Sequence, residues 1–103
     1  MRFIYLLVFF FVTISIAHAQ LRAVHKKGSY SYWVNTPSQN DLKADKLPIL
    51  VFLHGRSLSG SDINRVKRYG VLRAMEKGRS IDAIVVAPQT SNGWDADKVM
   101  NIV

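Results

Sequence analysis

Two continuous apolar runs mark the middle of the chain and predict two buried strands. The first, residues 48–53 (PILVFL), ends abruptly at His54, and the second, residues 81–87 (IDAIVVA), is stopped by Pro88. Runs that are apolar at nearly every position, rather than at alternate positions, are typical of strands covered on both faces in a parallel sheet. We therefore expect both strands to lie between layers of helices.

The segment between these runs, residues 61–78, has the pattern of a helix. Ser61 or Asp62 can cap its start, Gly78 can end it, and Gly70 is expected to divide it into two short pieces. A strand, a helix and a second strand within about forty residues form a βαβ unit. The fold class predicted from this pattern is α/β, with a mostly parallel sheet flanked by helices.

Shorter patterns predict the outer elements. Residues 28–36 alternate between Tyr or Val and Ser or Trp, which suits a strand with one wetter face. Residues 20–27 are polar and basic, and they form either an arm or the start of an edge strand, while residues 37–46 form a polar connector. Asp95 can cap a final helix whose apolar face is unfinished at Val103, so we expect the chain to stop within a longer domain.

The amino terminus has the pattern of a secretory signal peptide. A short positive start is followed by the largely apolar residues 3–17 and by an Ala-His-Ala cleavage pattern that ends at Ala19. The alternative is a transmembrane anchor, which needs an apolar run of about 20 residues. We expect residues 1–19 to be removed on export to the periplasm or the medium. Residues 20–27 are then an amino-terminal arm, and residues 28–103 belong to the folded domain.

Composition excludes several kinds of chemistry. The 103 residues contain no Cys, which excludes disulfides, thiol nucleophiles, Cys-ligated zinc and iron–sulfur clusters. Asp95 and Asp97 are explained more simply as carboxylates at a helix amino terminus than as metal ligands. We expect the protein to use neither a metal nor another cofactor.

The chain is basic, with 14 Lys and Arg against 7 Asp and Glu and a formal charge of +7. Residues 65–79 hold many of these cations, with Tyr69 among them. They show no nucleic-acid reading motif, and an exported protein rarely meets nucleic acid, so we expect no nucleic-acid partner. The stretch is expected to be a solvated helix face, with attraction to an anionic polymer as the alternative.

Candidate chemistry lies in the two loops that follow the apolar strands. Ligands of open parallel sheets bind beyond the carboxyl ends of the strands, and residues 54–60 (HGRSLSG) and 88–94 (PQTSNGW) leave those ends. Glycine leaves φ unrestricted, so backbone N–H groups there can turn toward an anion. Such a loop suits the stabilisation of a developing oxyanion. The alternative is that both segments are simple connecting turns.

Together, residues 47–62 (LPILVFLHGRSLSGSD) and 81–95 (IDAIVVAPQTSNGWD) resemble the amino-terminal part of an α/β-hydrolase. The closest resemblance is to secreted bacterial esterases and peptidase-like enzymes of the phospholipase/carboxylesterase and polyhydroxybutyrate-depolymerase type. The resemblance implies a serine hydrolase that cleaves carboxylic ester or peptide bonds in small-molecule or polymeric substrates. It implies an oxyanion-hole loop formed by His54, Gly55, Arg56 and Ser57, and a substrate pocket bordered by Gln89 and Trp94.

The catalytic triad of that family is absent from the 103 residues. Its nucleophile lies in a G-x-S-x-G elbow between a strand and a helix, followed by an acid and a late His. Residues 55–59 (GRSLS) lack the second Gly and precede a loop, so neither Ser57 nor Ser59 is expected to be the nucleophile. We expect a fold truncated before the elbow, with the triad beyond Val103, and a chain that is inactive alone. The alternative is a complete, non-enzymatic exported α/β module that binds an anionic polymer through its basic face.

Overall fold

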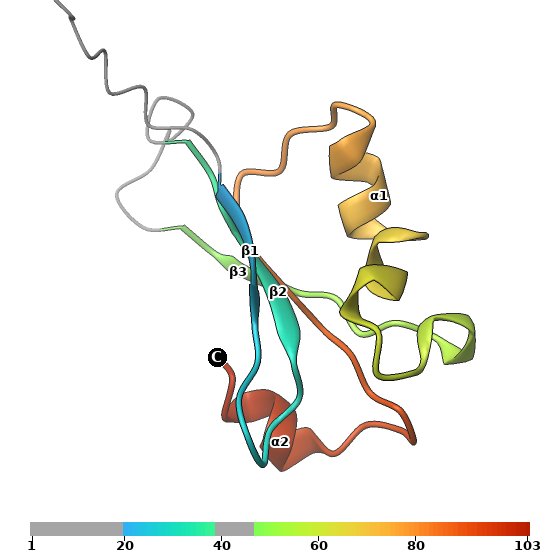
Figure 1. Cartoon of the computed structure of the whole chain (residues 1–103). Coiled ribbons are helices and arrows are strands. Elements are labelled where there is room, and N and C mark those ends of the chain that lie inside the picture. Colours follow the sequence, from blue (N-terminus) through green and yellow to red (C-terminus); the bar gives the residue numbers. More distant parts are fainter. Residues whose placement is uncertain (1–19, 39–46) are drawn as a thin grey trace, which may run out of the picture.

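The computed structural model of the protein describes residues 20–38 and 47–103, and its centre is a four-stranded sheet (Figure 1). The strands are β1 (Gln20–Val24), β2 (Tyr32–Thr36), β3 (Ile49–Val51) and β4 (Ile84–Pro88). Their spatial order is β1-β2-β4-β3. β1 pairs with β2 and β2 pairs with β4 in antiparallel fashion, whereas β3 runs parallel to β4.

This sheet corrects the fold class predicted from the sequence. It is mixed and mostly antiparallel, and the described residues contain only two short α-helices, α1 (Val71–Glu76) and α2 (Ala96–Met100), in place of layers on both faces. The apolar run that contains β3 is not covered on both sides, because β3 lies at the edge of the sheet and Ile49 is 47% exposed. An apolar run identifies a strand, but it does not fix which strands flank it or in which direction they run.

The segment after β3 folds into short helical pieces, with the break where the sequence predicts it. Two 3-10 helices, η2 (Arg56–Leu58) and η3 (Ile63–Lys67), precede α1. The Asp62 carboxylate accepts a hydrogen bond from the Asn64 N–H at 3.1 Å and caps η3. Gly70 separates η3 from α1 with a φ of +79°. The predicted cap at Asp62 and the predicted division at Gly70 are therefore confirmed.

The hydrophobic core lies between one face of the sheet and the helices η3 and α1. Ile63 and Val66 of η3 and Leu72 of α1 pack with Val85 and Ala87 of β4. Each of these residues is at most 8% exposed, and the burial of their apolar side chains holds the two layers together.

Trp33 joins the sheet to η3. Its side chain extends from β2 against the core, and its Nε1–H donates to the Ile63 carbonyl oxygen at 2.7 Å. The Lys67 ammonium lies 4.0 Å from the centre of the ring, which is the geometry of a cation–π contact.

We expect Trp33→Phe to lower the free energy of unfolding by about 2 kcal/mol, because it leaves the Ile63 carbonyl without its donor and removes part of a buried ring. Urea-induced unfolding measures the change. Lys67→Ala, which removes only the cation, is expected to cost less than about 1 kcal/mol. Equal effects of the two substitutions would show that the hydrogen bond to Ile63 contributes little.

The two ends of the described chain follow the remaining predictions in part. Residues 20–24 form β1, the edge-strand alternative for this segment. The Asp95 carboxylate accepts hydrogen bonds from the N–H groups of Asp97 and Lys98 at 2.9 and 3.2 Å, so it caps α2 as predicted.

The signal peptide predicted for residues 1–19 lies outside the described residues. Across residues 20–38 and 47–103, no helix has the length and apolar character needed to span a membrane.

Candidate functional site

The loops that follow β3 and β4 lie against each other, and the side chain of His54 joins them. His54 is only 4% exposed. Its Nε2 accepts a hydrogen bond from the Thr90 N–H at 3.0 Å, so Nε2 carries no proton. Nδ1 is then the protonated nitrogen, and it donates to the Gly55 carbonyl oxygen at 2.7 Å. The imidazole therefore holds the first residue of one loop against the backbone of the other.

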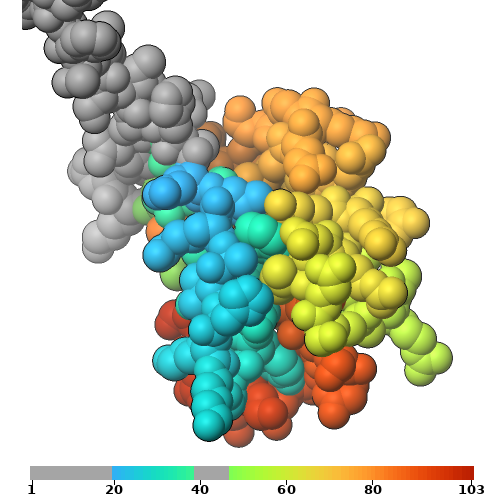
Figure 2. Space-filling model, in the orientation of Figure 1, coloured from blue at the N-terminus to red at the C-terminus, as the bar shows by residue number. Residues whose placement is uncertain are grey.

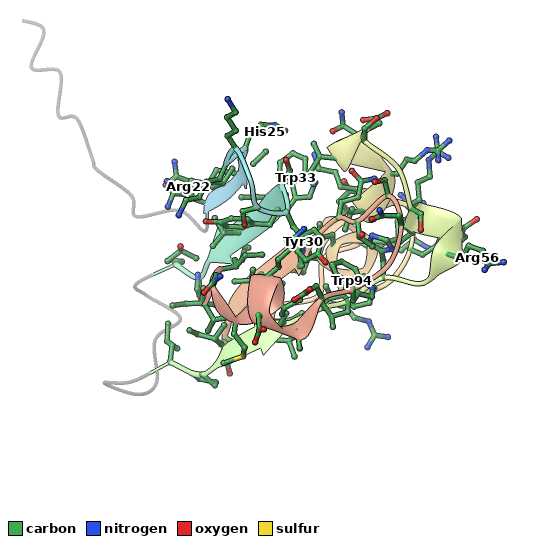
Figure 3. The ribbon with its side chains drawn as sticks, turned by 90° about the horizontal axis from the view of Figure 1, so that it is seen from below. Arg22, His25, Tyr30, Trp33, Arg56 and Trp94 are labelled. Atoms are coloured by element: carbon green, nitrogen blue, oxygen red, sulfur yellow. The ribbon has the colours of Figure 1, made fainter. Side chains whose placement is uncertain are left out.

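Trp94 covers this imidazole and adds a second connection. Its indole ring lies 4.8 Å from the His54 ring, centre to centre, and its Nε1–H donates to the His54 carbonyl oxygen at 3.1 Å. On its other side Trp94 meets Tyr30 edge to face at 5.2 Å. Tyr30 in turn accepts a hydrogen bond from the Asp95 N–H at 2.7 Å and donates to the Gly93 carbonyl oxygen at 3.3 Å. Figure 3 shows Tyr30 and Trp94 side by side near the centre of the molecule.

Gln89 makes a second set of hydrogen bonds between the same two loops. Its side chain is 5% exposed, and its Nε2 donates to the carbonyl oxygens of Leu58 and Asp62 at 3.0 and 2.8 Å. The Gly60 N–H donates to the Thr90 carbonyl oxygen at 3.1 Å. The backbone from His54 to Asp62 is thereby held against the backbone that follows β4 at several points.

A surface hollow of about 510 Å³ opens between the two loops. Gly55, Arg56 and Ser59 line it on one side, and Thr90 and Trp94 are among the residues on the other. Within residues 20–38 and 47–103, the backbone N–H groups of Gly55, Arg56 and Ser57 donate to no acceptor. The Arg56 side chain is exposed and lies at the outer end of its loop (Figure 3). A hollow edged by unengaged N–H groups is suited to an anion or to a polarised carbonyl oxygen.

The residues that the sequence predicts for the oxyanion-hole loop and the substrate pocket lie near one another in the structure, but they do not all line the same hollow. His54 lines the hollow, yet both of its ring nitrogens are engaged, so neither is free to accept a proton from a nucleophile. Trp94 lines the same hollow. Gln89 lies beside a neighbouring, more polar hollow of about 360 Å³, and its amide is used to fasten the loops. Ser57 is exposed and does not line the larger hollow.

Several cations of the basic stretch are engaged within the chain. Arg65 donates to the Ser59 carbonyl oxygen at 2.9 Å, Lys67 lies over Trp33, and Arg73 pairs with Glu76 at 3.5 Å. In the part of the chain that the structure describes, no group of three or more His, Asp or Glu side chains could hold a metal ion. Asp95 uses its carboxylate as a helix cap.

Sequence reasoning missed Tyr30 and Thr90, which complete the cluster around Trp94. Thr90 follows a strand-ending Pro-Gln pair, and its hydroxyl donates to the Gly93 carbonyl oxygen and accepts from the Asn92 N–H. A Thr near a Gly is a signal of a turn stabilised by its own side chain, so this contact could have been anticipated. The contact of Tyr30 with Asp95, 65 positions apart in the chain, could not.

Comparisons with known proteins add no further identification. No family model, no curated protein and no solved structure matches the chain.

Proposed function

We propose that the loop of residues 54–57 is the oxyanion-hole loop of an exported serine hydrolase that cleaves carboxylic ester or peptide bonds. The observation that carries the proposal is the fastening of this loop by His54 next to a hollow whose lining residues Gly55 and Arg56 have backbone N–H groups with no acceptor within the described residues. In esterases of the α/β-hydrolase type, one donor of the oxyanion hole comes from the loop after the third strand. Residues 54–57 follow β3, which ends at Val51, after two residues. The proposal needs this placement and does not need a mostly parallel sheet.

The chemistry assigned to the loop is electrostatic. When a nucleophilic oxygen attacks an ester or amide carbonyl, the carbonyl oxygen acquires negative charge in the tetrahedral intermediate. N–H donors that are already oriented toward that oxygen stabilise it without reorganisation, and this raises the rate. The contacts of His54 and Gln89 supply the rigidity that such orientation requires. Trp94 forms the opposite wall, against which an apolar part of the substrate would lie.

The nucleophile, base and acid are proposed to come from residues beyond Val103. A nucleotide sequence that continues past codon 103 into a further strand and a G-x-S-x-G turn is the expected result. A stop codon directly after Val103 would overturn the enzyme and favour an exported module that binds an anionic polymer. The 103-residue chain alone is expected to hydrolyse nitrophenyl esters no faster than its Ser57→Ala, Ser59→Ala variant.

In the complete enzyme, Arg56→Pro is expected to lower the rate of ester hydrolysis by about 10²–10³-fold, the usual loss for one oxyanion donor. Proline fits this position, because Arg56 is the first residue of η2 and Gly55 has an extended backbone, with φ −83° and ψ −176°. The change removes an N–H that has no acceptor within the described residues, so folding is expected to remain intact.

Arg56→Ala is the matched control, since it removes the exposed side chain and keeps the N–H. It is expected to change the rate less than about threefold, because exposed side chains away from the reacting atoms contribute little. Steady-state kinetics with a short nitrophenyl ester and a thermal melt compare the two variants. Equal and small effects of proline and alanine would rule out this loop as the oxyanion hole.

A further inference from the structure

A third hollow, of about 320 Å³, lies at the opposite end of β4 from the loops described above. It opens between the start of β1, the end of β2 and the segment that follows α1. In Figure 2 the residues after α1, in orange, occupy the upper end of the molecule next to the blue atoms of β1. The volume is at the lower end of the range of about 300–1,000 Å³ that is usual for small-molecule sites.

The wall of this hollow is largely apolar. Leu21, Leu72, Met75 and Ile81 contribute side chains to it. Leu72 is 1% exposed, so the floor of the hollow is continuous with the hydrophobic core. An apolar body placed here would therefore gain the free energy of leaving water.

One buried polar group lines this apolar wall. Asn35 of β2 is 6% exposed, and its side chain makes no hydrogen bond with any residue in the described ranges 20–38 and 47–103. The other buried polar residues there, His54, Gln89 and Thr90, all have hydrogen-bonded side chains. No side-chain N or O atom in these ranges is both fully buried and without a partner, so the amide atoms of Asn35 remain accessible to solvent. The amide of Asn35 is therefore available to a ligand.

The charged residues at the hollow do not select for either an anion or a cation. Glu76, Arg79 and Asp82 contribute to its lining, and Glu76 is paired with Arg73 at 3.5 Å. Acidic and basic groups at the same opening oppose one another in their effect on a charged ligand. The group that a ligand must match is the amide of Asn35, which offers both N–H donors and a carbonyl acceptor.

We propose that this hollow binds a small, uncharged amphiphile whose apolar chain lies against Leu72 and Met75 and whose carboxamide pairs with the amide of Asn35. A carboxamide is the simplest neutral group that returns one donor and one acceptor to another amide. A site built around such a pair discriminates against ligands that lack the donor, because the Asn35 oxygen is then left without a partner. This site is separate from the proposed oxyanion loop and does not rest on it.

The test compares three probes of nearly the same shape by ligand-observed saturation-transfer NMR on the 103-residue protein. Hexanamide has the donor and the acceptor, methyl pentyl ketone has only the acceptor, and hexanoate has a charge. Hexanamide is expected to bind saturably and about fivefold to tenfold more tightly than either of the others, which corresponds to one or two neutral hydrogen bonds.

Two variants assign the preference to this hollow. Asn35→Leu is expected to bring hexanamide down to the affinity of the ketone, while Asn64→Leu, the same change at an exposed amide of η3, keeps the preference. Met75→Trp is expected to fill the hollow and abolish binding of all three probes. The proposal is overturned if no probe binds saturably, if the unmodified protein binds the ketone or hexanoate as tightly as hexanamide, or if the preference survives in Asn35→Leu.

Discussion

Replacing Gly70 with alanine is expected to destabilise the protein by about 3–4 kcal/mol, a large share of the roughly 5–15 kcal/mol that holds a domain folded. Gly70 has φ +79° and ψ −147°, a backbone conformation found almost only in glycine. A Cβ atom at this position would lie 2.3 Å from Cζ of Phe52, whose ring packs against the core. The strained backbone contributes about 1–2 kcal/mol, and moving the ring out of its packed position contributes about as much again.

Gly28 provides a matched control for the backbone term. Its φ is +80°, close to that of Gly70, but a Cβ there would meet no atom within 4 Å. Gly28→Ala is expected to cost about 1 kcal/mol. Urea-induced unfolding of both variants measures the difference in their free energies of unfolding, to which the contact with Phe52 is expected to contribute most. Similar losses in the two variants would mean that the Phe52 ring moves aside without cost.

The second large effect is expected at His54. His54→Leu keeps most of the buried volume but removes the acceptor for the Thr90 N–H and the donor to the Gly55 carbonyl. The buried Thr90 N–H then loses its acceptor, which costs about 1–3 kcal/mol. The Gly55 carbonyl keeps the hydrogen bond from the Leu58 N–H and loses only its second donor, which costs about 1 kcal/mol. We expect a total loss of about 2–4 kcal/mol in the free energy of unfolding, together with faster amide hydrogen exchange in the loops after β3 and β4.

Two control variants test whether the loss in His54→Leu is specific to the bonds of the His54 imidazole. His25 is exposed, and its Nδ1 contacts the Ser31 hydroxyl at 3.0 Å, so His25→Leu is expected to cost less than about 0.5 kcal/mol. His54→Gln places an amide oxygen near the position of Nε2 and is expected to recover part of the stability lost in His54→Leu. Unchanged hydrogen exchange in His54→Leu would contradict the role of the imidazole as the link between the loops.

The local features of the fold could be predicted from the sequence because they depend on neighbouring residues. A cap needs a carboxylate two or three positions before a free N–H, and both Asp62 and Asp95 meet that requirement. The break at Gly70 follows from the conformational freedom of glycine. The meeting of the two loops follows from their position after strands that pair in parallel, β3 and β4.

The direction of β2 and the exposure of β3 could not be predicted in the same way. The alternation in residues 28–36 indicates a strand, but an antiparallel and a parallel partner both satisfy it. The apolar residues of β3 suggested burial on both faces, whereas the strand lies at an edge and leaves Ile49 and Leu50 47% and 42% exposed. The bonds of His54 and Gln89 join residues about thirty positions apart, and no local pattern signals such a pair.

The two tryptophans of the chain stand in different parts of the fold, and this gives the protein two separate optical reporters. Trp33 lies between the sheet and η3, whereas Trp94 lies on the imidazole that links the loops. Indole fluorescence responds to the immediate surroundings of the ring. A variant that retains only Trp33 therefore follows the separation of the core layers, and one that retains only Trp94 follows the parting of the loops. Coincident transitions would show that loops and core unfold as one cooperative unit, and an earlier Trp94 transition would show that the loops open while the core is still intact.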